Sequence, residues 1–352
     1  MASSWRPRSE AWLQRSPSRF LGTPDRPLFI GGCPRSGTTL LRSMLDNHPE
    51  LGIPHETNFV RPLWWQRIHF GDLEDPANRR RVAEWIFKDD SVRGGRLRSG
   101  RIRRNAAIRR VAGAPPTIGS IVQACLQLYA ELHGKRRWGD KRPAYSGFIG
   151  MLFAMFPNAQ YINVVRDPRG AVASQRLMNW DAPEVAVPAA TARWEGAIHR
   201  ADHFARSLRP DQLLDLRYED LVSDPHATLQ RVCTFAGLDA GDAIETMINA
   251  ERPGTLRGVH ERVTDPVTTD SIERWRERLA PSEVALIERG TQPLLERFGY
   301  RPVDHQQPEP TERDLRELAR QRRLSRREWR TSRRDELLRR ARYRRPVAAI
   351  DA

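Results

Sequence analysis

The chain of 352 residues is 39% hydrophobic and carries a formal net charge of +15. This composition indicates a mostly globular protein, with one large α/β domain or two smaller domains. It contains no run of 18 or more apolar residues, and its first 20 residues lack the apolar core of a signal peptide. We therefore expect neither a membrane span nor secretion, and a cytoplasmic location.

The positive charge is concentrated near the C-terminus. Residues 311–352 hold 15 arginines against 7 acidic residues, which is over half of the excess charge. Such a run is either a solvated surface or a binding surface for polyanions such as nucleic acid. Lysine is rare, because only Lys88, Lys135 and Lys141 accompany 56 arginines. A lysine kept in an arginine-rich protein suggests a specific role.

The first predicted element follows an N-terminal arm, residues 1–26, that is rich in Ser, Pro and Arg and is expected to be flexible. Leu28–Ile30 form a short apolar run, which predicts a buried strand. Thr38–Leu45 place apolar residues at helical spacing, which predicts a helix. The residues between them, 34–39, therefore form a turn from strand to helix.

This turn has the chemistry of an anion site. Backbone N–H groups at a helix N-terminus are unpaired and carry the positive end of the helix dipole, so they bind phosphate or sulfate oxygens. Gly37 allows close approach, Arg35 adds a planar cation, and hydroxyl donors come from Ser36, Thr38 and Thr39. The turn lacks the lysine of the Walker pattern GxxxxGK[ST]. An ordinary turn rich in small residues is the alternative.

Two further strand and helix units are predicted. Between the first unit and these lies a basic helical region, from Pro62 to about Ala112, that a Gly-containing loop at 93–104 interrupts. Strands are predicted at Tyr161–Val165 and from Leu213. Helices are predicted at Thr117–His133 with Thr117 as N-cap, at Ser146–Phe156, at Gly170–Leu177, from the turn at Ser223–Pro225 to Phe235, and from Ser271 to Phe298.

Strands that alternate with helices imply a parallel sheet covered on both faces, with ligands at the C-terminal ends of its strands. We therefore expect an α/β fold with a P-loop-like parallel sheet over residues 27–303. Residues 304–352 form an Arg-rich tail that is helical or disordered.

The three cysteines, Cys33, Cys125 and Cys233, are widely spaced and show no CxxC pairing. This spacing argues against a disulfide framework and against a zinc site. Cys33 lies beside the turn, but no histidine partner for a nucleophilic cysteine is identifiable. Buried free thiols are the better interpretation.

Several segments together resemble the PAPS-dependent sulfotransferases, and most closely the protein-tyrosine sulfotransferases of that superfamily. They occur in the family order and span about residues 27–303. The segments are PRSGTT at 34–39, HET at 55–57, DKRP at 140–143, VVRDPRGAVAS at 164–174, RYEDLVSDP at 217–225, ERW at 273–275 and FGY at 298–300.

The resemblance implies a binding site for 3′-phosphoadenylyl sulfate (PAPS). The turn from Arg35 to Thr39 would hold its 5′-phosphosulfate, and Arg166 with Ser174 would hold its 3′-phosphate. Tyr218 matches the family's aromatic residue near the nucleotide, and Arg274 matches a basic residue that closes over the phosphates. The alternatives are an Arg166–Asp167 ion pair, a core tyrosine and a surface arginine.

The resemblance also implies catalytic roles. Glu56 matches the general base of the protein-tyrosine branch, although many other sulfotransferases use a histidine there and His55 is adjacent. Lys141 matches the lysine on the bridging oxygen of the leaving group, and Arg35 would stabilise the sulfuryl oxygens. These cations do the work that magnesium does in kinases, so no metal is expected. Glu56 could instead pair with a nearby arginine.

Two departures from the protein-tyrosine pattern concern the acceptor and the phosphate contacts. Asn58 replaces a basic residue, and Met178 replaces a further phosphate-contacting arginine, with Arg176 nearby. The loop 254–270 is shorter than in the family, which leaves Thr264, Thr268 and Thr269 as uncertain hydroxyl contributors. The expected acceptor is a hydroxyl of a tyrosine or phenol, a carbohydrate or another alcohol. Rival functions are a P-loop-type small-molecule kinase that uses Mg-ATP and an Arg-rich nucleic-acid-binding protein.

Overall fold

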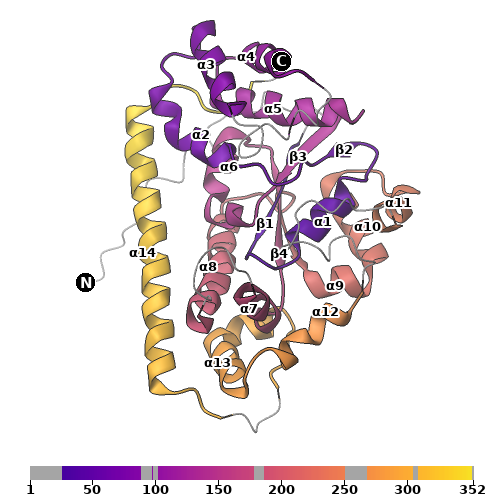
Figure 1. Ribbon diagram of the computed structural model, residues 1–352, viewed down its shortest axis with the longest axis vertical. Helices are drawn as coiled ribbons and strands as arrows, with labels where there is room; N and C mark the ends of the chain where they lie inside the picture. The colour runs from indigo at the N-terminus through magenta and orange to yellow at the C-terminus, as the bar shows by residue number, and fades with distance from the viewer. Residues whose placement is uncertain are drawn as a thin grey trace.

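The protein is built around a five-stranded parallel sheet (Figure 1). The computed structural model describes residues 26–88, 97, 102–177, 186–249, 268–303 and 308–350. The strand order is β2-β3-β1-β4-β5, and every neighbouring pair is parallel. The strands are β1 Leu28–Gly32, β2 Leu51–Gly52, β3 Arg137–Lys141, β4 Gln160–Val165 and β5 Leu213–Arg217.

The sheet confirms the α/β prediction and adds two strands that the sequence pattern did not indicate. The strands predicted at 28–30, at 161–165 and from 213 are β1, β4 and β5. β3 has the sequence RWGDK, in which four of five residues are not apolar, yet all five are buried. β2 is only two residues long. Neither has the continuous apolar run that indicates a buried parallel strand.

Helices cover both faces of the sheet. Successive side chains of each strand point to opposite faces, so both faces carry apolar residues that pack against helices. On one face, Leu28 and Ile30 pack with α1 (Thr38–Leu45), α10 (Pro225–Ala236) and α11 (Ala243–Asn249). On the other, Phe29 belongs to a larger apolar cluster. Its helices are α2 (Val60–Gln66), α3 (Pro76–Ile86), α4 (Arg104–Ala112), α5 (Ile118–Leu132) and α6 (Ile149–Met155).

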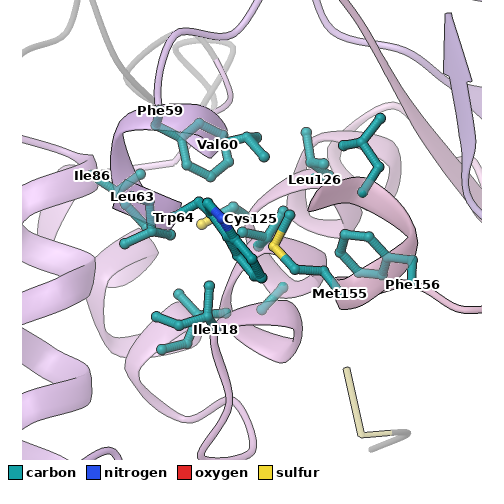
Figure 2. Close-up of a cluster of buried hydrophobic side chains, with 14 of the residues drawn as sticks. Phe59, Val60, Leu63, Trp64, Ile86, Ile118, Cys125, Leu126, Met155 and Phe156 are labelled. Carbon is teal, nitrogen blue, oxygen red and sulfur yellow. The ribbon is translucent and has the colours of Figure 1, made fainter. Parts of the chain in front are cut away.

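Figure 2 shows part of this larger cluster, with Trp64 between Phe59, Ile118 and Met155. The predicted helix at Thr117–His133 is confirmed as α5, and the Thr117 side chain accepts a hydrogen bond from Ser120 N. Phe59 and Val60, at the start of α2, belong to the same cluster. The loop that contains Glu56 is therefore anchored to this core at its C-terminal end.

A third group of helices follows β4 and β5 along the chain. α7 (Pro168–Arg176), α8 (Val187–Ala205) and α13 (Pro281–Arg297) pack together, and α9 (Tyr218–Ser223) follows β5. The prediction of a single helix from Ser271 to Phe298 was wrong. The chain forms α12 (Asp270–Glu273), a 3₁₀ turn and then α13, which begins at Pro281. Proline favours the first turn of a helix, where its missing N–H costs no hydrogen bond.

The helical interpretation of the tail is confirmed, because α14 (Glu312–Arg342) runs along α8 (Figure 1). Leu318 is buried in this contact, and Glu336 accepts a 2.6 Å hydrogen bond from Trp64 Nε1. The tail helix therefore packs on the domain, while the boundary at residue 304 stays a prediction. None of the helices in the described ranges has both the length and the apolar composition needed to cross a membrane.

Candidate active site

The C-terminal ends of the strands bring the predicted site residues to one edge of the sheet. The turn 34–39 follows β1, Lys141 ends β3, Arg166 follows β4 and Tyr218 follows β5. Glu56 lies in the loop after β2. Because all five strands are parallel, these positions share an edge, as ligand sites of open α/β sheets do.

The turn after β1 has an unusual backbone. Arg35 is the only non-glycine residue with positive φ in the part of the chain that the structure describes, with φ of 70°. Gly37 has φ of 91°, and a Cβ there would lie 2.3 Å from the Tyr218 ring. The turn therefore needs glycine at this position both for its backbone and for its packing. Ser36 Oγ is buried and has no hydrogen-bond partner among the described residues, so it is a donor that a bound oxyanion could use.

Arg35, which follows β1, forms one contact cluster with Arg166, which follows β4, and with Ser174 of α7. Arg35 Nε donates to Ser174 Oγ at 3.0 Å, and Arg166 Nη1 donates to the Arg35 carbonyl at 3.1 Å. The Arg166 guanidinium also lies 4.5 Å from the centre of the Tyr218 ring. Burial, and then repulsion from Arg166, lowers the pKa of Arg35. Two neighbouring guanidinium groups at a helix N-terminus favour a doubly charged anion.

The alternative ion pair between Arg166 and Asp167 is not formed. Asp167 instead pairs with Arg169 at 2.6 Å, and its side chain caps α7 by accepting from Arg169 N. The structure thus leaves the Arg166 side chain directed at the turn.

α12 adds a residue that sequence analysis missed. Ser271 Oγ lies 2.5 Å from the Tyr218 hydroxyl, and the Ser271 carbonyl accepts from Arg166 Nη2 at 2.7 Å. Arg274, three residues on, lies 4.0 Å from the Asp270 carboxylate, and its Nη1 is buried without a hydrogen-bond partner in the described ranges. α12 therefore closes the Arg166 side of the site. The signal for Ser271 in the sequence was a hydroxyl side chain two positions before the ERW segment at 273–275.

Lys141 and Glu56 meet on the other side of the turn. Lys141 has no exposed surface, and its Nζ donates to Thr39 Oγ1 at 3.1 Å. The same nitrogen lies 3.6 Å from a carboxylate oxygen of Glu56, whose side chain is 28% exposed. Burial lowers the pKa of Lys141, and the charge of Glu56 opposes that shift. A fixed cation thus contacts both the turn and a carboxylate that solvent can reach.

A second group of residues that sequence analysis missed fixes the Glu56 loop. Asp140 is fully buried and accepts hydrogen bonds from Thr57 Oγ1 at 2.8 Å and from the Tyr145 hydroxyl. Arg142 Nη1 donates to the Thr57 carbonyl at 3.2 Å. Burial raises the pKa of Asp140 to about 6. Because Thr57 and Asp140 are the sequence neighbours of Glu56 and Lys141, their hydrogen bond holds the Glu56 and Lys141 side chains opposite each other.

The sequence profile of the sulfotransferase family matches residues 27–242, which is more than half of the chain. The chain belongs to the sulfotransferase family.

Relatives of this sulfotransferase include two named for tyrosine. The chain is 26% identical over 286 residues to a protein-tyrosine sulfotransferase of Drosophila melanogaster, covering 78% of this chain and 52% of the relative. It is 27% identical to protein-tyrosine sulfotransferase A of Caenorhabditis elegans, covering 78% of this chain and 67% of that one. The chain thus spans about half the length of the fly relative. These relatives confirm the predicted resemblance to the protein-tyrosine sulfotransferase-like branch.

Solved structures agree on the fold. A sulfotransferase domain from the curacin biosynthetic pathway is similar with a TM-score of 0.57 at 20% identity, covering 79% of this chain and 99% of that one. The sulfotransferase domain of the Synechococcus PCC 7002 olefin synthase gives a TM-score of 0.53 at 23% identity, covering 79% and 96%. At these identities the similarity concerns the fold alone.

The remaining predicted residues of this sulfotransferase are placed as follows. Cys33 is buried, burial raises its pKa to about 12, and its sulfur accepts from Gln175, which confirms the predicted buried free thiol. Arg176 contacts the Glu283 carboxylate at 2.8 Å. Met178 and Thr264 lie outside the described residues, and Thr268 and Thr269 precede α12. No cluster of three metal-ligating side chains occurs in the described ranges.

Proposed function

We propose that this chain transfers the sulfuryl group of PAPS to a hydroxyl group of an acceptor. One observation carries the proposal: the buried Lys141 ammonium contacts both Thr39 of the anion-binding turn and the carboxylate of Glu56. Group transfer from an anhydride to a hydroxyl needs a cation at the leaving oxygen and a base at the attacking oxygen. Lys141 and Glu56 provide these groups within 3.6 Å of each other.

Binding of the donor would use two neighbouring anion sites, the turn at 34–39 and the pair Arg166 and Ser174. The Arg35–Thr39 turn would hold the 5′-phosphosulfate with backbone N–H groups and the buried Ser36 hydroxyl. Arg166 and Ser174, which both contact Arg35 and offer a guanidinium fork and a hydroxyl, would hold the 3′-phosphate, as the family resemblance implies. The membership of the sulfotransferase family supports PAPS as the donor. Tyr218, stacked on Arg166, would line the nucleotide.

Transfer would proceed in line. Glu56 takes the proton of the acceptor hydroxyl as the hydroxyl oxygen forms a bond to sulfur. The bond between sulfur and the 5′-phosphate oxygen breaks, and that oxygen keeps the electron pair. Lys141 faces the developing negative charge as a compact point charge, while Arg35 stabilises the sulfuryl oxygens. The products are a sulfate ester and 3′,5′-ADP.

The acceptor class that we would test first is a tyrosine hydroxyl, because two relatives are protein-tyrosine sulfotransferases. Phenols, carbohydrates and other alcohols remain within the proposal. The test is transfer from radiolabelled PAPS to tyrosine peptides, glycans and small phenols. Labelled product with any of these acceptors supports the proposal, and its absence with all of them counts against it.

Nucleotide specificity separates this proposal from a kinase. In a thermal-shift titration without magnesium, 3′,5′-ADP should raise the melting temperature, since a ligand that binds only the folded state stabilises it. Arg166→Ala should reduce this shift. Stabilisation by Mg-ATP alone would contradict the proposal and favour a P-loop-type kinase.

A further inference from the structure

Arg200, on α8, is a mostly buried cation without an ion-pair partner. Its guanidinium forms no hydrogen bond or ion pair with any residue that the structure describes, and its Nε is fully buried. Burial lowers the pKa of Arg200, and the negative charge of Glu328, with which it forms no ion pair, opposes that shift. A buried charge is normally paired, because removing it from water is costly. An arginine in this position therefore favours the binding of an anion.

A pocket of about 280 Å³ lies beside Arg200, between α8 and α14. Figure 1 shows these two helices side by side, with α14 on the outside of the molecule. The pocket-lining side chains that can bind an anion are Arg200, Arg322, Arg326, Arg330, His199 and Ser325.

The single carboxylate that lines this pocket is already neutralised. Glu195 accepts from Arg322 Nε at 2.6 Å and lies 3.5 Å from His199 Nε2. Burial alone would raise the pKa of Glu195, but the hydrogen bonds from His199 and Arg322 lower it. Arg326 and Arg330, like Arg200, form no ion pair with the described residues. The pocket thus keeps an excess of positive charge.

Two donors converge beside Gly196. A Cβ at Gly196 would lie 3.0 Å from Arg200 Nη1 and 3.1 Å from Ser325 Oγ, which is tighter than an ordinary contact. The missing side chain therefore lets a guanidinium nitrogen and a hydroxyl approach the same point of the α8 backbone. These are the donor types that bind phosphate, sulfate and carboxylate oxygens. Trp329 adds a flat apolar wall to the same pocket.

We propose that the pocket between α8 and α14 binds a small organic oxyanion, with its charged group at Arg200 and Ser325 and an aromatic or apolar body against Trp329. None of the pocket residues belongs to the candidate active site. The inference does not depend on the proposed sulfuryl transfer, because it rests on Arg200, Gly196 and the residues around them.

The test is calorimetric titration of the full chain with three probes, phenyl phosphate, phenyl sulfate and benzoate. Saturating 3′,5′-ADP is present so that the turn at 34–39 is occupied. We expect at least one probe to bind with 1:1 stoichiometry. Arg200→Met should weaken it at least tenfold, and Gly196→Ala should weaken it by displacing Arg200 Nη1 and Ser325 Oγ. Arg206→Met, which removes an exposed arginine from the end of the same helix, should leave the affinity unchanged.

A merely structural role for Arg200 predicts a different result. If Arg200 stabilises the fold, Arg200→Met should lower the melting temperature of the ligand-free protein. If Arg200 instead binds an anion, Arg200→Met removes a mostly buried charge without an ion-pair partner. The melting temperature of the ligand-free variant should then equal or exceed that of the wild type. Failure of all three probes to bind the wild type, equal affinity in Arg200→Met, or a lower melting temperature of that variant would overturn the inference.

Discussion

Lys141 and Glu56 face each other at the edge of the sheet, with the ammonium nitrogen 3.6 Å from a carboxylate oxygen. The two side chains differ in burial. Lys141 ends β3, an inner strand of the sheet, and is fully buried, whereas Glu56 lies in a loop and is partly exposed. The pair therefore combines a fixed charge with a carboxylate that an acceptor can approach.

Glu56→Gln should abolish most of the transfer. Glutamine keeps the shape and a hydrogen-bond acceptor for Lys141, but it cannot take a proton, so we expect a loss of about 10²- to 10⁴-fold in rate. Binding of 3′,5′-ADP should be unchanged, because Glu56 does not line the anion turn. Single-turnover transfer and calorimetry measure the two quantities. Glu74→Gln, at an exposed position, is the control. Full activity of Glu56→Gln would move the base to His55 or elsewhere.

Lys141→Met and Lys141→Arg should both lose transfer. Methionine fills a similar volume without the charge, and we expect a loss of roughly 10²- to 10³-fold in rate, as for other electrostatic contacts to a developing anion. Arginine keeps the charge, but its larger planar group does not fit a site with no exposed surface. Lys88→Met removes an exposed lysine and should be neutral. Recovery of activity in Lys141→Arg would show that charge alone is sufficient.

Arg166→Lys should weaken nucleotide binding more than it slows transfer at saturating donor. Lysine lacks the planar fork of the guanidinium, whose Nη1 and Nη2 donate to the Arg35 and Ser271 carbonyls. A lost charge-assisted contact of about 1.5–3 kcal/mol corresponds to roughly 10- to 150-fold in the dissociation constant of 3′,5′-ADP. Arg209→Lys, in an exposed pair with Asp211, provides the matched comparison. Unchanged ADP affinity would remove Arg166 from the phosphate site.

The parts of the site that lie close together in the sequence could be predicted, whereas contacts between distant segments could not. The turn at 34–39 was predictable because its strand, glycine and helix are contiguous. β3 was not, because its buried polar residues serve the site and interrupt the apolar pattern. Asp140 and Thr57 were missed for a related reason. They are 83 residues apart, so their hydrogen bond exists only after β3 has paired with β1.

Gly37→Ala should disable the anion turn without removing a functional group. The added Cβ would lie 2.3 Å from the Tyr218 ring, and the positive φ disfavours any residue with a Cβ. We expect 3′,5′-ADP binding to be lost while the rest of the sheet folds, as measured by calorimetry and circular dichroism. Gly134→Ala, also at a positive φ but with no atom within 4 Å of the added Cβ, is the control for the stability cost of such a backbone and should keep ADP affinity. Wild-type ADP affinity in Gly37→Ala would mean that the turn tolerates the Cβ and that Tyr218 yields.

Asp140→Asn should change how stability depends on pH. Burial raises the pKa of Asp140 to about 6, above the ordinary 3.8, so the folded protein keeps a proton that the unfolded chain releases between these values. The free energy of unfolding should therefore fall as pH rises from 4 to 6, by on the order of 3 kcal/mol from this group, and its contribution should be constant above that.

Asparagine removes this dependence but keeps an acceptor for Thr57 and Tyr145, because its amide nitrogen can replace Oδ1, which has no hydrogen-bond partner in the described ranges. Urea denaturation of both proteins from pH 4 to 8 measures the difference. Wild type should lose stability relative to Asp140→Asn across pH 4–6 and then run parallel to it. Asp75→Asn, at an exposed helix cap, should follow wild type throughout. Parallel curves for Asp140→Asn and wild type over the whole range would show that Asp140 stays ionised, and that the hydrogen bonds from Thr57 and Tyr145 outweigh its burial.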